Sequence, residues 1–508
     1  MTTSDAYDVA VIGYGPTGAT AANLLGQLGL NVVVIERDPD VYNRARAIST
    51  DEEVMRIWQS VGLADRLQQD MLADRPLNFV DASGVPFIDL KVTPRGTGHP
   101  PQQFFYQPAV ERVLRDGVAR FGNVDVLLQH ECLRLHPGST DVELMLTDVR
   151  TDAVKRVRAS YVIAADGGSS PTRGQLGVGY TGRTYSERWV VIDTKVREEW
   201  PSHDRLRFHC NPARPTVDCP TPLGHHRWEY PARDGELESE LLQHESIWRV
   251  LNAQGITDRN VEILRAVIYS HHNRVAERWR VGRVFLAGDA AHAMPPWIGQ
   301  GMSAGIRDAA NLCWKIATVL SGQAPESLLD SYQAERQPHV TEVTRRACRA
   351  GRLITERNRA AAFFRNHLLR TVLRIPGLGT GLSKYTWIPA ARYRHGFLGT
   401  VTHRAAGWQI PQPWVTAADG TRVRLDDVVG GRWAIIHTGE RPSGADAWDV
   451  PTIPVTEPSL ARWLHRKNAA AVVVRPDGFI YAAAGSGQPL PPPPAGFVFS
   501  AVISKAHT

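Results

Sequence analysis

Short apolar runs rich in β-branched residues mark the N-terminal part of the chain, and each leads into a glycine-containing loop. They lie at 7–12, 31–35, 161–165 and 283–287, and helical apolar spacing over 19–30 follows the first run. Continuous apolar runs of this length are typical of strands buried on both faces of a parallel sheet. The pattern therefore predicts an α/β unit built on such a sheet.

The pattern changes between residues 180 and 275, where apolar and polar positions alternate. Alternation is clearest over 189–196, 205–209 and 226–230, and a period of two is typical of antiparallel strands. We therefore expect a β-sheet inserted into the α/β unit. Alternation alone does not tell which face of that sheet meets a ligand.

A basic helical stretch at 345–374 separates these units from a tail with its own pattern. Short apolar runs at 423–429, 433–437, 470–474 and 476–480 predict a further, strand-rich α/β unit. A length of 508 residues agrees with two or three domains.

Composition is that of an ordinary globular protein, with 43% hydrophobic and 22% charged residues. The 58 Lys and Arg residues and the 52 Asp and Glu residues give a formal net charge of +6. The basic residues are scattered, which argues against a nucleic-acid partner and allows anionic ligands. The five cysteines form no CxxC pair, so a reducing cytoplasm suits them better than a disulfide framework. No run reaches the ~18 apolar residues of a membrane span, and we expect no membrane partner.

The turn after the first apolar run has the spacing GxGxxG, with glycines at Gly13, Gly15 and Gly18. In a strand–turn–helix unit, the first glycine permits the tight turn, the second lets a pyrophosphate approach the backbone, and the third allows close helix packing. The free N–H groups of the helix N-terminus favour phosphate. The second strand ends in Glu36, whose carboxylate can accept hydrogen bonds from a ribose. A negative charge there disfavours a 2′-phosphate, so FAD or NAD fits this turn better than NADP.

Two further motifs follow apolar runs, Asp166-Gly167 and Gly288-Asp289. Each alone is compatible with an ordinary turn of a parallel sheet. Together with the glycine turn, and in this order, they resemble the fingerprints of the FAD-dependent aromatic hydroxylases, the class A flavoprotein monooxygenases. Within that family the resemblance is closest to the phenol hydroxylases and 3-(3-hydroxyphenyl)propionate hydroxylases. Three supporting stretches lie at 210–215, 227–230 and 332–338.

The resemblance implies a set of FAD contacts. Glu36 would hold the adenosine ribose, and the loop that begins with the Pro296 carbonyl would border the isoalloxazine ring. A helix that starts near Gly301 would direct its N-terminal dipole at the flavin N1/O2 region. Arg173 would join Asp166 in contacts with FAD and pyridine nucleotide; a surface ion pair is the alternative for this arginine. The residues expected at the cofactor are Gly13, Gly15, Pro16, Thr17, Gly18, Glu36, Arg37, Arg46, Gln107, Asp166, Arg173, Gly288, Asp289, Pro296, Gly299, Gly301 and Met302.

The resemblance also implies a domain organisation. Residues 1–179 and 276–395 would form a Rossmann-like FAD-binding domain of the glutathione-reductase type, with connecting helices. Residues 180–275 would form a mixed or antiparallel β-sheet domain for the substrate. Residues 396–508 resemble a thioredoxin-like C-terminal domain, although no cysteine follows Cys348, which excludes thiol redox chemistry there.

The activity that the resemblance implies is hydroxylation of a phenol by O2 and NADPH or NADH, through a flavin C4a-hydroperoxide. Tailoring of a polyketide or antibiotic, by hydroxylation or Baeyer–Villiger insertion, is the first alternative, and a non-enzymatic flavin-binding protein is the second. A base that deprotonates the phenol is expected, and the sequence assigns none. His209 and Tyr230 are candidates for the substrate pocket.

The remaining expectations concern metals, assembly and location. The pairs His225-His226 and His271-His272 lack the i, i+4 spacing and carboxylates of a metal-binding helix, so we expect no metal. A cytoplasmic enzyme, with a homodimer as one open assembly, agrees with the composition. The identity of the phenol and the choice between NADH and NADPH stay open.

Overall fold

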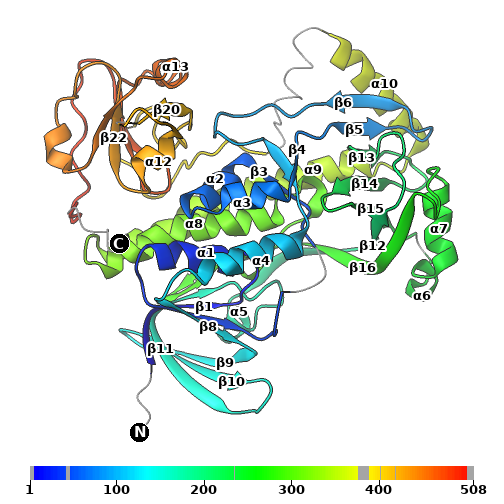
Figure 1. Ribbon diagram of the computed structural model, residues 1–508, viewed down its shortest axis with the longest axis horizontal. Helices are drawn as coiled ribbons and strands as arrows, with labels where there is room; N and C mark the ends of the chain where they lie inside the picture. Colours follow the sequence, from blue (N-terminus) through cyan, green and yellow to red (C-terminus); the bar gives the residue numbers. More distant parts are fainter. Residues whose placement is uncertain are drawn as a thin grey trace.

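The four apolar runs of the N-terminal part form neighbouring strands of one sheet in a computed structural model of the chain (Figure 1). The structure describes residues 5–41, 46–233, 235–375, 388–400, 402–417 and 419–499. The order of this first sheet is β17-β18-β11-β1-β2-β8, and β10 and β9 extend it from β11. Its strands are β1 (Asp5–Ile12), β2 (Val32–Glu36), β8 (Val124–Leu128), β9 (His130–Pro137), β10 (Val142–Asp148), β11 (Val154–Ala164), β17 (Arg280–Val281) and β18 (Val284–Leu286).

The central strands of the first sheet run parallel, as predicted. Strand β1 pairs in parallel with β11 and β2, and β11 pairs in parallel with β18. Both faces are buried: Val9 and Val34 pack under helices, whereas Ala10 and Val33 pack against apolar side chains such as Leu144 of β10. Burial on both faces explains why these strands are continuous apolar runs.

Three helices cross the first sheet, α1 (Pro16–Gln27), α4 (Gln107–Val118) and α8 (Gly301–Leu320) (Figure 1). Leu25 of α1 and Ile306 of α8 belong to the same core cluster as Val9 of the sheet. This packing directs the N-termini of α1 and α8 toward the loops that follow the parallel strands. The other elements of this part are β3 (Ser49–Asp51), α2 (Glu52–Ser60), α3 (Ala64–Gln69), β4 (Leu72–Ala73), β7 (Gln102–Phe104), α5 (Pro171–Gln175), η1 (Gly288–Ala290), η2 (Pro296–Ile298), η3 (Glu326–Asp330) and α9 (Ser331–Ile354).

The alternating region builds a second sheet, with the order β19-β16-β12-β15-β14-β13-β5-β6. Pairing is antiparallel except between β13 and β5, so the predicted antiparallel strands are confirmed. The sheet also takes β5 and β6 from before residue 180 and β19 from after residue 275. Its strands are β5 (Leu77–Val80), β6 (Pro86–Leu90), β12 (Tyr180–Val196), β13 (Leu206–His209), β14 (Thr216–Thr221), β15 (His225–Pro231), β16 (Val261–Ala276) and β19 (His292–Ala293).

The two faces of the second sheet have different neighbours. Trp228 and Tyr230 pack with the apolar side chains of α6 (Glu238–Leu241) and α7 (His244–Asn252). On the opposite face, Val217 and Cys219 belong to a cluster that includes Trp297 and residues of α10 (Arg359–Arg374). We call this second face the inner face, because Trp297 belongs to the loop that leads into α8.

The C-terminal part forms a four-stranded sheet with the order β23-β22-β24-β25. Strand β22 pairs in parallel with β23 and antiparallel with β24, and β24 pairs antiparallel with β25. Apolar side chains on both faces make two clusters, one of which includes Trp314 of α8. The elements of this part are β20 (Trp414–Thr416), β21 (Arg422–Arg424), α12 (Leu425–Val429), β22 (Ala434–His437), η4 (Ala445–Trp448), β23 (Thr452–Pro454), α13 (Pro458–Arg466), β24 (Ala471–Val474) and β25 (Ile480–Ala484).

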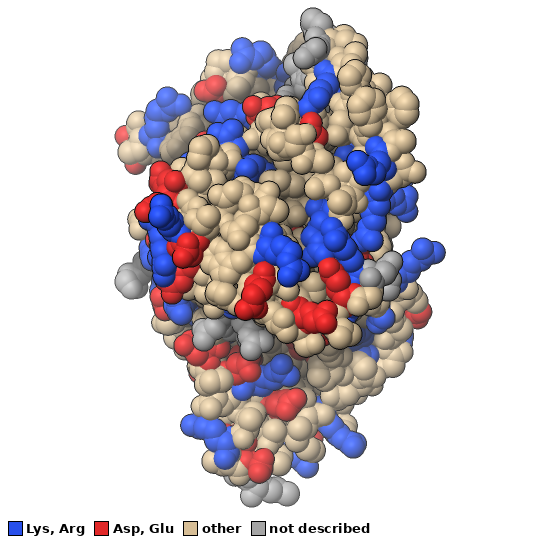
Figure 2. Space-filling model, turned by 90° about the vertical axis from the view of Figure 1, so that its right-hand side faces the viewer, with Lys and Arg blue, Asp and Glu red and all other residues tan. Residues whose placement is uncertain are grey.

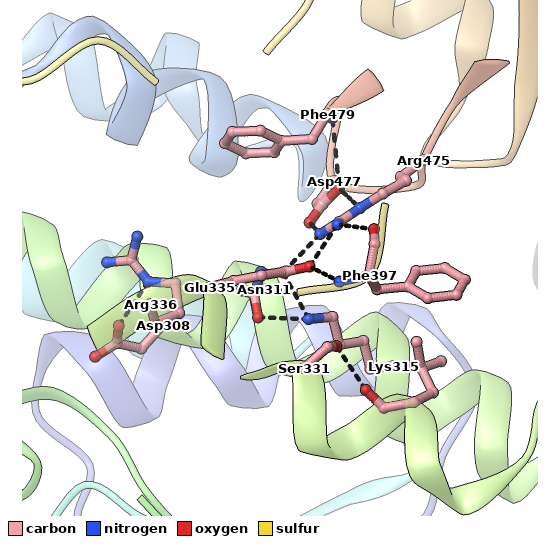
Figure 3. Close-up of polar contacts among 11 residues, drawn as sticks. Asp308, Asn311, Lys315, Ser331, Glu335, Arg336, Phe397, Arg475, Asp477 and Phe479 are labelled. Carbon is pink, nitrogen blue, oxygen red and sulfur yellow. Dashed lines mark hydrogen bonds and ion pairs between the residues drawn. The ribbon is translucent and has the colours of Figure 1, made fainter. Parts of the chain in front are cut away.

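Buried ion pairs fasten the C-terminal part to helices α8 and α9 (Figure 3). Arg475 donates to both carboxylate oxygens of Glu335 in α9, at 2.7 and 3.0 Å, and it also pairs with Asp477. Lys315 of α8 reaches the same glutamate at 2.7 Å. Two buried cations therefore face two buried anions at this interface, the arrangement in which buried charges are tolerated.

The molecular surface carries charges of both signs. On the face shown in Figure 2, Lys and Arg side chains are interspersed with Asp and Glu side chains. Among the described residues, no helix combines the length and the apolar character that a membrane crossing needs.

Candidate functional site

The glycine turn after β1 has the geometry that its spacing predicts. Gly13 has φ +96°, and a Cβ there would lie 2.4 Å from the Ala165 carbonyl oxygen. A Cβ on Gly18 would lie 2.0 Å from the Gly13 carbonyl oxygen, whereas a Cβ on Gly15 would meet nothing within 4 Å. Gly13 and Gly18 therefore serve the protein's own packing, and Gly15 leaves open space above the turn.

Helix α1 begins at this turn with Pro16 at its first position and has no side-chain cap. The N–H groups of its first turn are thus available to an anion. Thr17 packs against the next loop: a Cβ on Gly288 would lie 2.8 Å from its Oγ1, and one on Gly305 would lie 2.3 Å away. The glycine turn and the Gly-Asp motif therefore lie in direct contact.

Glu36 lies at the end of β2, beside the glycine turn. Its Oε2 accepts a hydrogen bond from the Tyr14 backbone N–H at 2.8 Å, and its Oε1 accepts one from the Asp38 backbone N–H at 2.9 Å. These bonds fix the carboxylate at the edge of the turn and leave lone pairs for a ribose. Arg37 is 70% exposed and lies 3.9 Å from the Asp38 carboxylate.

The Asp-Gly motif places a carboxylate oxygen without a partner near the same turn. Oδ2 of Asp166 accepts from the Thr172 backbone N–H at 3.0 Å, whereas Oδ1 is buried and has no hydrogen-bond partner among the described residues. Arg173 donates to the carbonyls of Ala290 and Gly168 at 3.0 and 2.8 Å. It is buried and joins the loops of both distant motifs through carbonyl groups, and no ion pair of this arginine is found among the described residues.

The Gly-Asp motif is held by Asp308 of α8. The Asp308 carboxylate accepts from the Gly288 N–H at 3.1 Å and from His292 at 2.6 Å, and Arg336 donates to it at 2.8 Å. Burial alone raises the pKa of Asp308, but His292 and Arg336 outweigh this effect and lower it. Asp289 is exposed, and none of the hydrogen bonds found among the described residues involves its carboxylate.

The loop before α8 brings its N-terminus into the same region. Gly299 has φ +61°, and a Cβ there would lie 2.3 Å from the Ser49 Oγ. The N–H of Gly299 donates to the Pro296 carbonyl at 2.8 Å. Helix α8 begins at Gly301, followed by the half-buried Met302, and has no side-chain cap, so a second set of N–H groups is available to a ligand.

Gln107 lies at the start of α4 and bonds to backbone groups of the segment that follows β2. Its Oε1 accepts from the backbone N–H groups of Arg46 and Ala47, both at 2.7 Å, and its Nε2 donates to Glu111 at 2.7 Å. The side chain therefore fixes the segment that follows β2, and one amide hydrogen is left for a ligand. Arg46 is exposed at this segment.

Most of the residues expected at the cofactor converge at the carboxyl ends of β1, β11 and β18, next to two uncapped helix N-termini. This is the edge at which open α/β sheets bind dinucleotides. The open space over Gly15 and the unpartnered Asp166 oxygen are features that a dinucleotide would satisfy. The donor set therefore fits FAD.

The two substrate-pocket candidates lie away from this edge. The Tyr230 hydroxyl is buried against α6 and α7, without a hydrogen-bond partner among the described residues. His209 Nε2 lies 2.6 Å from Asp218, which also binds His226 and Arg207. Burial alone raises the pKa of Asp218, but these partners hold it well below its usual range. Register places both candidates on the face opposite the inner face.

The inner face carries charged residues that the sequence reasoning did not assign. Asp193 accepts from Arg227 and Arg265, each at 2.6 Å, and Arg227 also donates to the Arg46 carbonyl at 2.9 Å. Glu229 lies 3.7 Å from Arg227. The sequence could have indicated them, because Arg227 and Glu229 alternate with apolar residues in a strand, and charged residues in a buried strand are typical of a functional site.

Trp297 joins the loop before α8 to the inner face of the second sheet. Its ring packs edge-on against Trp189 of β12, with ring centroids 4.8 Å apart, and lies 5.8 Å from the ring of His271. Beneath it, Gly351 of α9 leaves room, because a Cβ there would lie 2.4 Å from the indole nitrogen. The loop that precedes α8 therefore contacts both the second sheet and α9.

Comparisons with known proteins agree with this geometry. A family described as "FAD binding domain" matches residues 6–347, and one described as "HcaD C-terminal domain" matches residues 407–450. A 3-(3-hydroxy-phenyl)propionate/3-hydroxycinnamic acid hydroxylase of Burkholderia cenocepacia is 36% identical and covers 93% of each chain. The flavin-dependent monooxygenase PieE, in complex with FAD and substrate, matches with a TM-score of 0.80 at 23% identity, covering 94% of this chain and 95% of that one. The OxyS anhydrotetracycline hydroxylase of Streptomyces rimosus matches with a TM-score of 0.77 at 26% identity, covering 94% and 96%.

These matches confirm what the three motifs predict. The first family covers more than half of the chain, and the hydroxylase relative covers nearly all of it. The cofactor is FAD, and reduced nicotinamide and O2 are the co-substrates. The chain belongs to the family of FAD-dependent aromatic hydroxylases.

Proposed function

We propose that this hydroxylase acts on a single-ring phenol that carries a carboxylate side chain, of the 3-(3-hydroxyphenyl)propionate type. The observation that carries the proposal is 36% identity, over 93% of both chains, to a hydroxylase named for that substrate. Such similarity extends over the second sheet and over the first sheet with the helices that pack on it, which we call the cofactor part. The product would be the corresponding catechol.

We propose that FAD binds across the edge formed by β1, β11 and β18. The N-terminus of α1 would face the pyrophosphate, Glu36 the adenosine ribose, and Asp289 the hydroxyls of the ribityl chain or the pyrophosphate. The uncapped N-terminus of α8 would stabilise negative charge on the flavin. When bound, FAD accepts a hydride from reduced nicotinamide and activates O2 for insertion into the ring.

The chain's own residues would position the phenol and exclude water. We propose that the substrate lies on the inner face of the second sheet, beside Trp297, where Trp189 and Val191 supply apolar surface. We assign His209 and Tyr230 to the packing of the opposite face. Exclusion of water matters because it prevents unproductive release of peroxide.

We also propose domain limits and a class for the C-terminal part. Residues 1–179 and 276–395 would act as the cofactor domain, 180–275 as the core of the substrate domain and 396–508 as a thioredoxin-like domain. The strand order β23-β22-β24-β25, with one parallel and two antiparallel pairs, supports the last assignment. A cytoplasmic location and a homodimer remain predictions; light scattering of the purified protein measures the assembly.

Tailoring of a larger polycyclic phenol is the second candidate. The anhydrotetracycline hydroxylase, 26% identical over 94% of this chain, favours it. Pocket size separates the two candidates, because a single-ring pocket excludes a fused-ring substrate by steric overlap.

A substrate panel tests the proposal. Hydroxyphenylpropionates, simple phenols and polycyclic phenols are each added to the purified protein with NADH or NADPH, and product, oxidised nucleotide and peroxide are measured. We expect 3-(3-hydroxyphenyl)propionate to give product equal to the nucleotide consumed. If only a polycyclic phenol gives product equal to the nucleotide consumed, the second candidate is supported instead. Protein purified without FAD would overturn both candidate functions.

A further inference from the structure

Glu229 lies at the centre of the inner face of the second sheet. In the sheet register it pairs with Val191 of β12 and with Val217 of β14. The neighbouring row on one side contains Trp189, which contacts Trp297. The neighbouring row on the other side contains Arg227, which donates to the Arg46 carbonyl of the cofactor part. Glu229 therefore lies between the two points at which this face meets the cofactor part.

The carboxylate of Glu229 differs from the other charged groups on this face. Its side chain is 18% exposed and lies 3.7 Å from Arg227, and no hydrogen bond involving it is found among the described residues. Burial raises the pKa of Glu229; Arg227 opposes this effect, and Asp193 adds to it. A half-buried acceptor without a hydrogen-bonded partner is available to a ligand.

We propose that Glu229 accepts the proton of the substrate's phenolic hydroxyl and is the catalytic base of the hydroxylation. The proposal rests on the proposed function, because it requires a phenol on the inner face, beside Trp297. In that position the ring packs on apolar neighbours of Glu229, and its hydroxyl reaches the carboxylate. Arg227 would stay beside the carboxylate and keep it ionised before the proton arrives.

The phenolic proton passes to Glu229 and later returns to the same oxygen. When an activated oxygen bonds to the ring carbon ortho to the hydroxyl, the phenolic O–H bond breaks and its proton passes to a Glu229 oxygen. The electron pair of that bond forms the carbonyl of a cyclohexadienone. Loss of the proton from the oxygenated carbon restores the aromatic ring, and Glu229 returns its proton to the carbonyl oxygen. The net change at the ring is one C–H converted to C–OH, with oxidant and reductant supplied by O2 and reduced nicotinamide.

The other titratable groups of the inner face are less suited to this step. Both oxygens of Asp193 accept from arginines at 2.6 Å, and although burial raises its pKa, Arg227 and Arg265 outweigh this and lower it. Burial raises the pKa of the Cys219 thiol, which keeps it neutral. Burial lowers the pKa of His271 to about 4, so this imidazole is a weak base. A carboxylate with a raised pKa matches a phenol better.

The test compares Glu229→Gln and Glu229→Asp with the wild type, all as FAD-loaded enzymes. Glu262→Gln is the matched control, because Glu262 belongs to the same sheet but is 53% exposed and pairs with Arg197. We expect Glu229→Gln to lower the hydroxylation rate about 10²–10⁴-fold, the usual range for a general base. It should also abolish the acid limb of the pH profile, which rises as Glu229 ionises. Glu229→Asp should retain that limb at a reduced rate.

Binding measurements separate a base from a residue that only shapes the pocket. Dissociation constants are measured by flavin fluorescence for the phenol and for its methyl ether, which has no proton to give. We expect Glu229→Gln to raise the dissociation constant of the phenol and to leave that of the methyl ether unchanged. An equal increase in the two dissociation constants, or an acid limb of the pH profile that persists in Glu229→Gln, would overturn the proposal.

The wild type distinguishes failure of this proposal from failure of the proposed function. If the wild type hydroxylates a different phenol, the proposed substrate class is wrong, and the Glu229 variants are tested with the accepted phenol. If the wild type hydroxylates no phenol, the proposed function and the base fail together. If the wild type converts 3-(3-hydroxyphenyl)propionate and Glu229→Gln does so equally well, only the base is wrong.

Discussion

Individual glycines of the turn after β1 have separable tasks. Gly18 allows α1 to pack onto Gly13, because a Cβ on Gly18 would lie 2.0 Å from the Gly13 carbonyl oxygen. Gly15 has φ −72° and open space around it, so alanine suits its backbone. The protein itself does not require a glycine at position 15, whereas a ligand that passes over the turn does.

This difference gives a prediction for a matched pair of variants. Gly18→Ala should lower the free energy of unfolding by about 1–3 kcal/mol through overpacking and should lose FAD as well. Gly15→Ala should unfold like the wild type when FAD is removed from both, yet bind FAD more weakly. Thermal unfolding with and without added FAD measures both effects. Gly15→Ala protein that retains FAD as tightly as the wild type would show that the pyrophosphate does not pass over this residue.

At the scale of elements, the site depends on loops from distant strands that are joined by a few side chains. Arg173 of α5 binds carbonyls of the loops after β11 and β18 and stacks over the Tyr180 ring, with its guanidinium carbon 3.7 Å from the ring centroid. Asp308 of α8 holds the Gly288 N–H. A planar guanidinium serves this purpose because it donates in two directions at once.

Much of the cofactor edge could be predicted from the sequence, because each motif is local. Spacing alone indicates that Gly13 turns the chain and that β2 ends in Glu36. The inner face could not be predicted in the same way. Alternation shows that Arg227 and Glu229 share one face and Tyr230 the other, but only the packing of Trp297 and α7 decides which face meets the cofactor part.

The pairing between distant segments could not be predicted from the sequence either. Leu77 pairs in parallel with Leu206, so β5 and β6 extend the second sheet although its next strand along the chain, β12, begins only at Tyr180. Arg173 shows a second limit: its neighbours along the chain do not reveal that two carbonyls from separate loops surround it. Long-range contacts of this kind depend on how complete elements pack.

At the scale of the whole molecule, the C-terminal part is an integral partner of the cofactor part. Glu335, fully buried in α9, binds Arg475 and Lys315, and its neighbour Arg336 holds Asp308 (Figure 3). A second link joins Arg56 of α2 to Asp426 of α12. Helices α8 and α9 therefore connect the attachment of the C-terminal part to the Gly-Asp motif.

The buried ion pair gives a prediction for stability. Arg475→Met leaves the fully buried Glu335 with one cation fewer and should cost about 3–5 kcal/mol of unfolding free energy. The matched control is Arg441→Met in the same part, because Arg441 and Asp446 form an exposed pair that contributes little. Denaturant unfolding, followed by tryptophan fluorescence, measures both variants.

The ion pairs of Glu335 also predict how the stability of the protein depends on pH. Burial alone raises the pKa of Glu335, but Arg475 and Lys315 outweigh this effect and lower it to about 2. A carboxylate with a lowered pKa in the folded state stabilises it above the unfolded value of 4.5, and this contribution is lost as the pH falls toward 2. The stability of the wild type should therefore drop more steeply in this window than that of Arg475→Met. Parallel pH profiles would contradict this role of the ion pair.

Isotopic labelling shows whether this chain uses FAD to insert one oxygen atom from O2 into a phenol. The purified FAD-loaded protein is mixed with reduced nicotinamide and 3-(3-hydroxyphenyl)propionate under labelled O2, and the product is analysed by mass spectrometry. We predict a catechol that carries one labelled oxygen atom, formed in proportion to the nucleotide oxidised. Nucleotide oxidation that yields only labelled peroxide, or a product whose new oxygen comes from water, would show that the chain does not carry out this reaction.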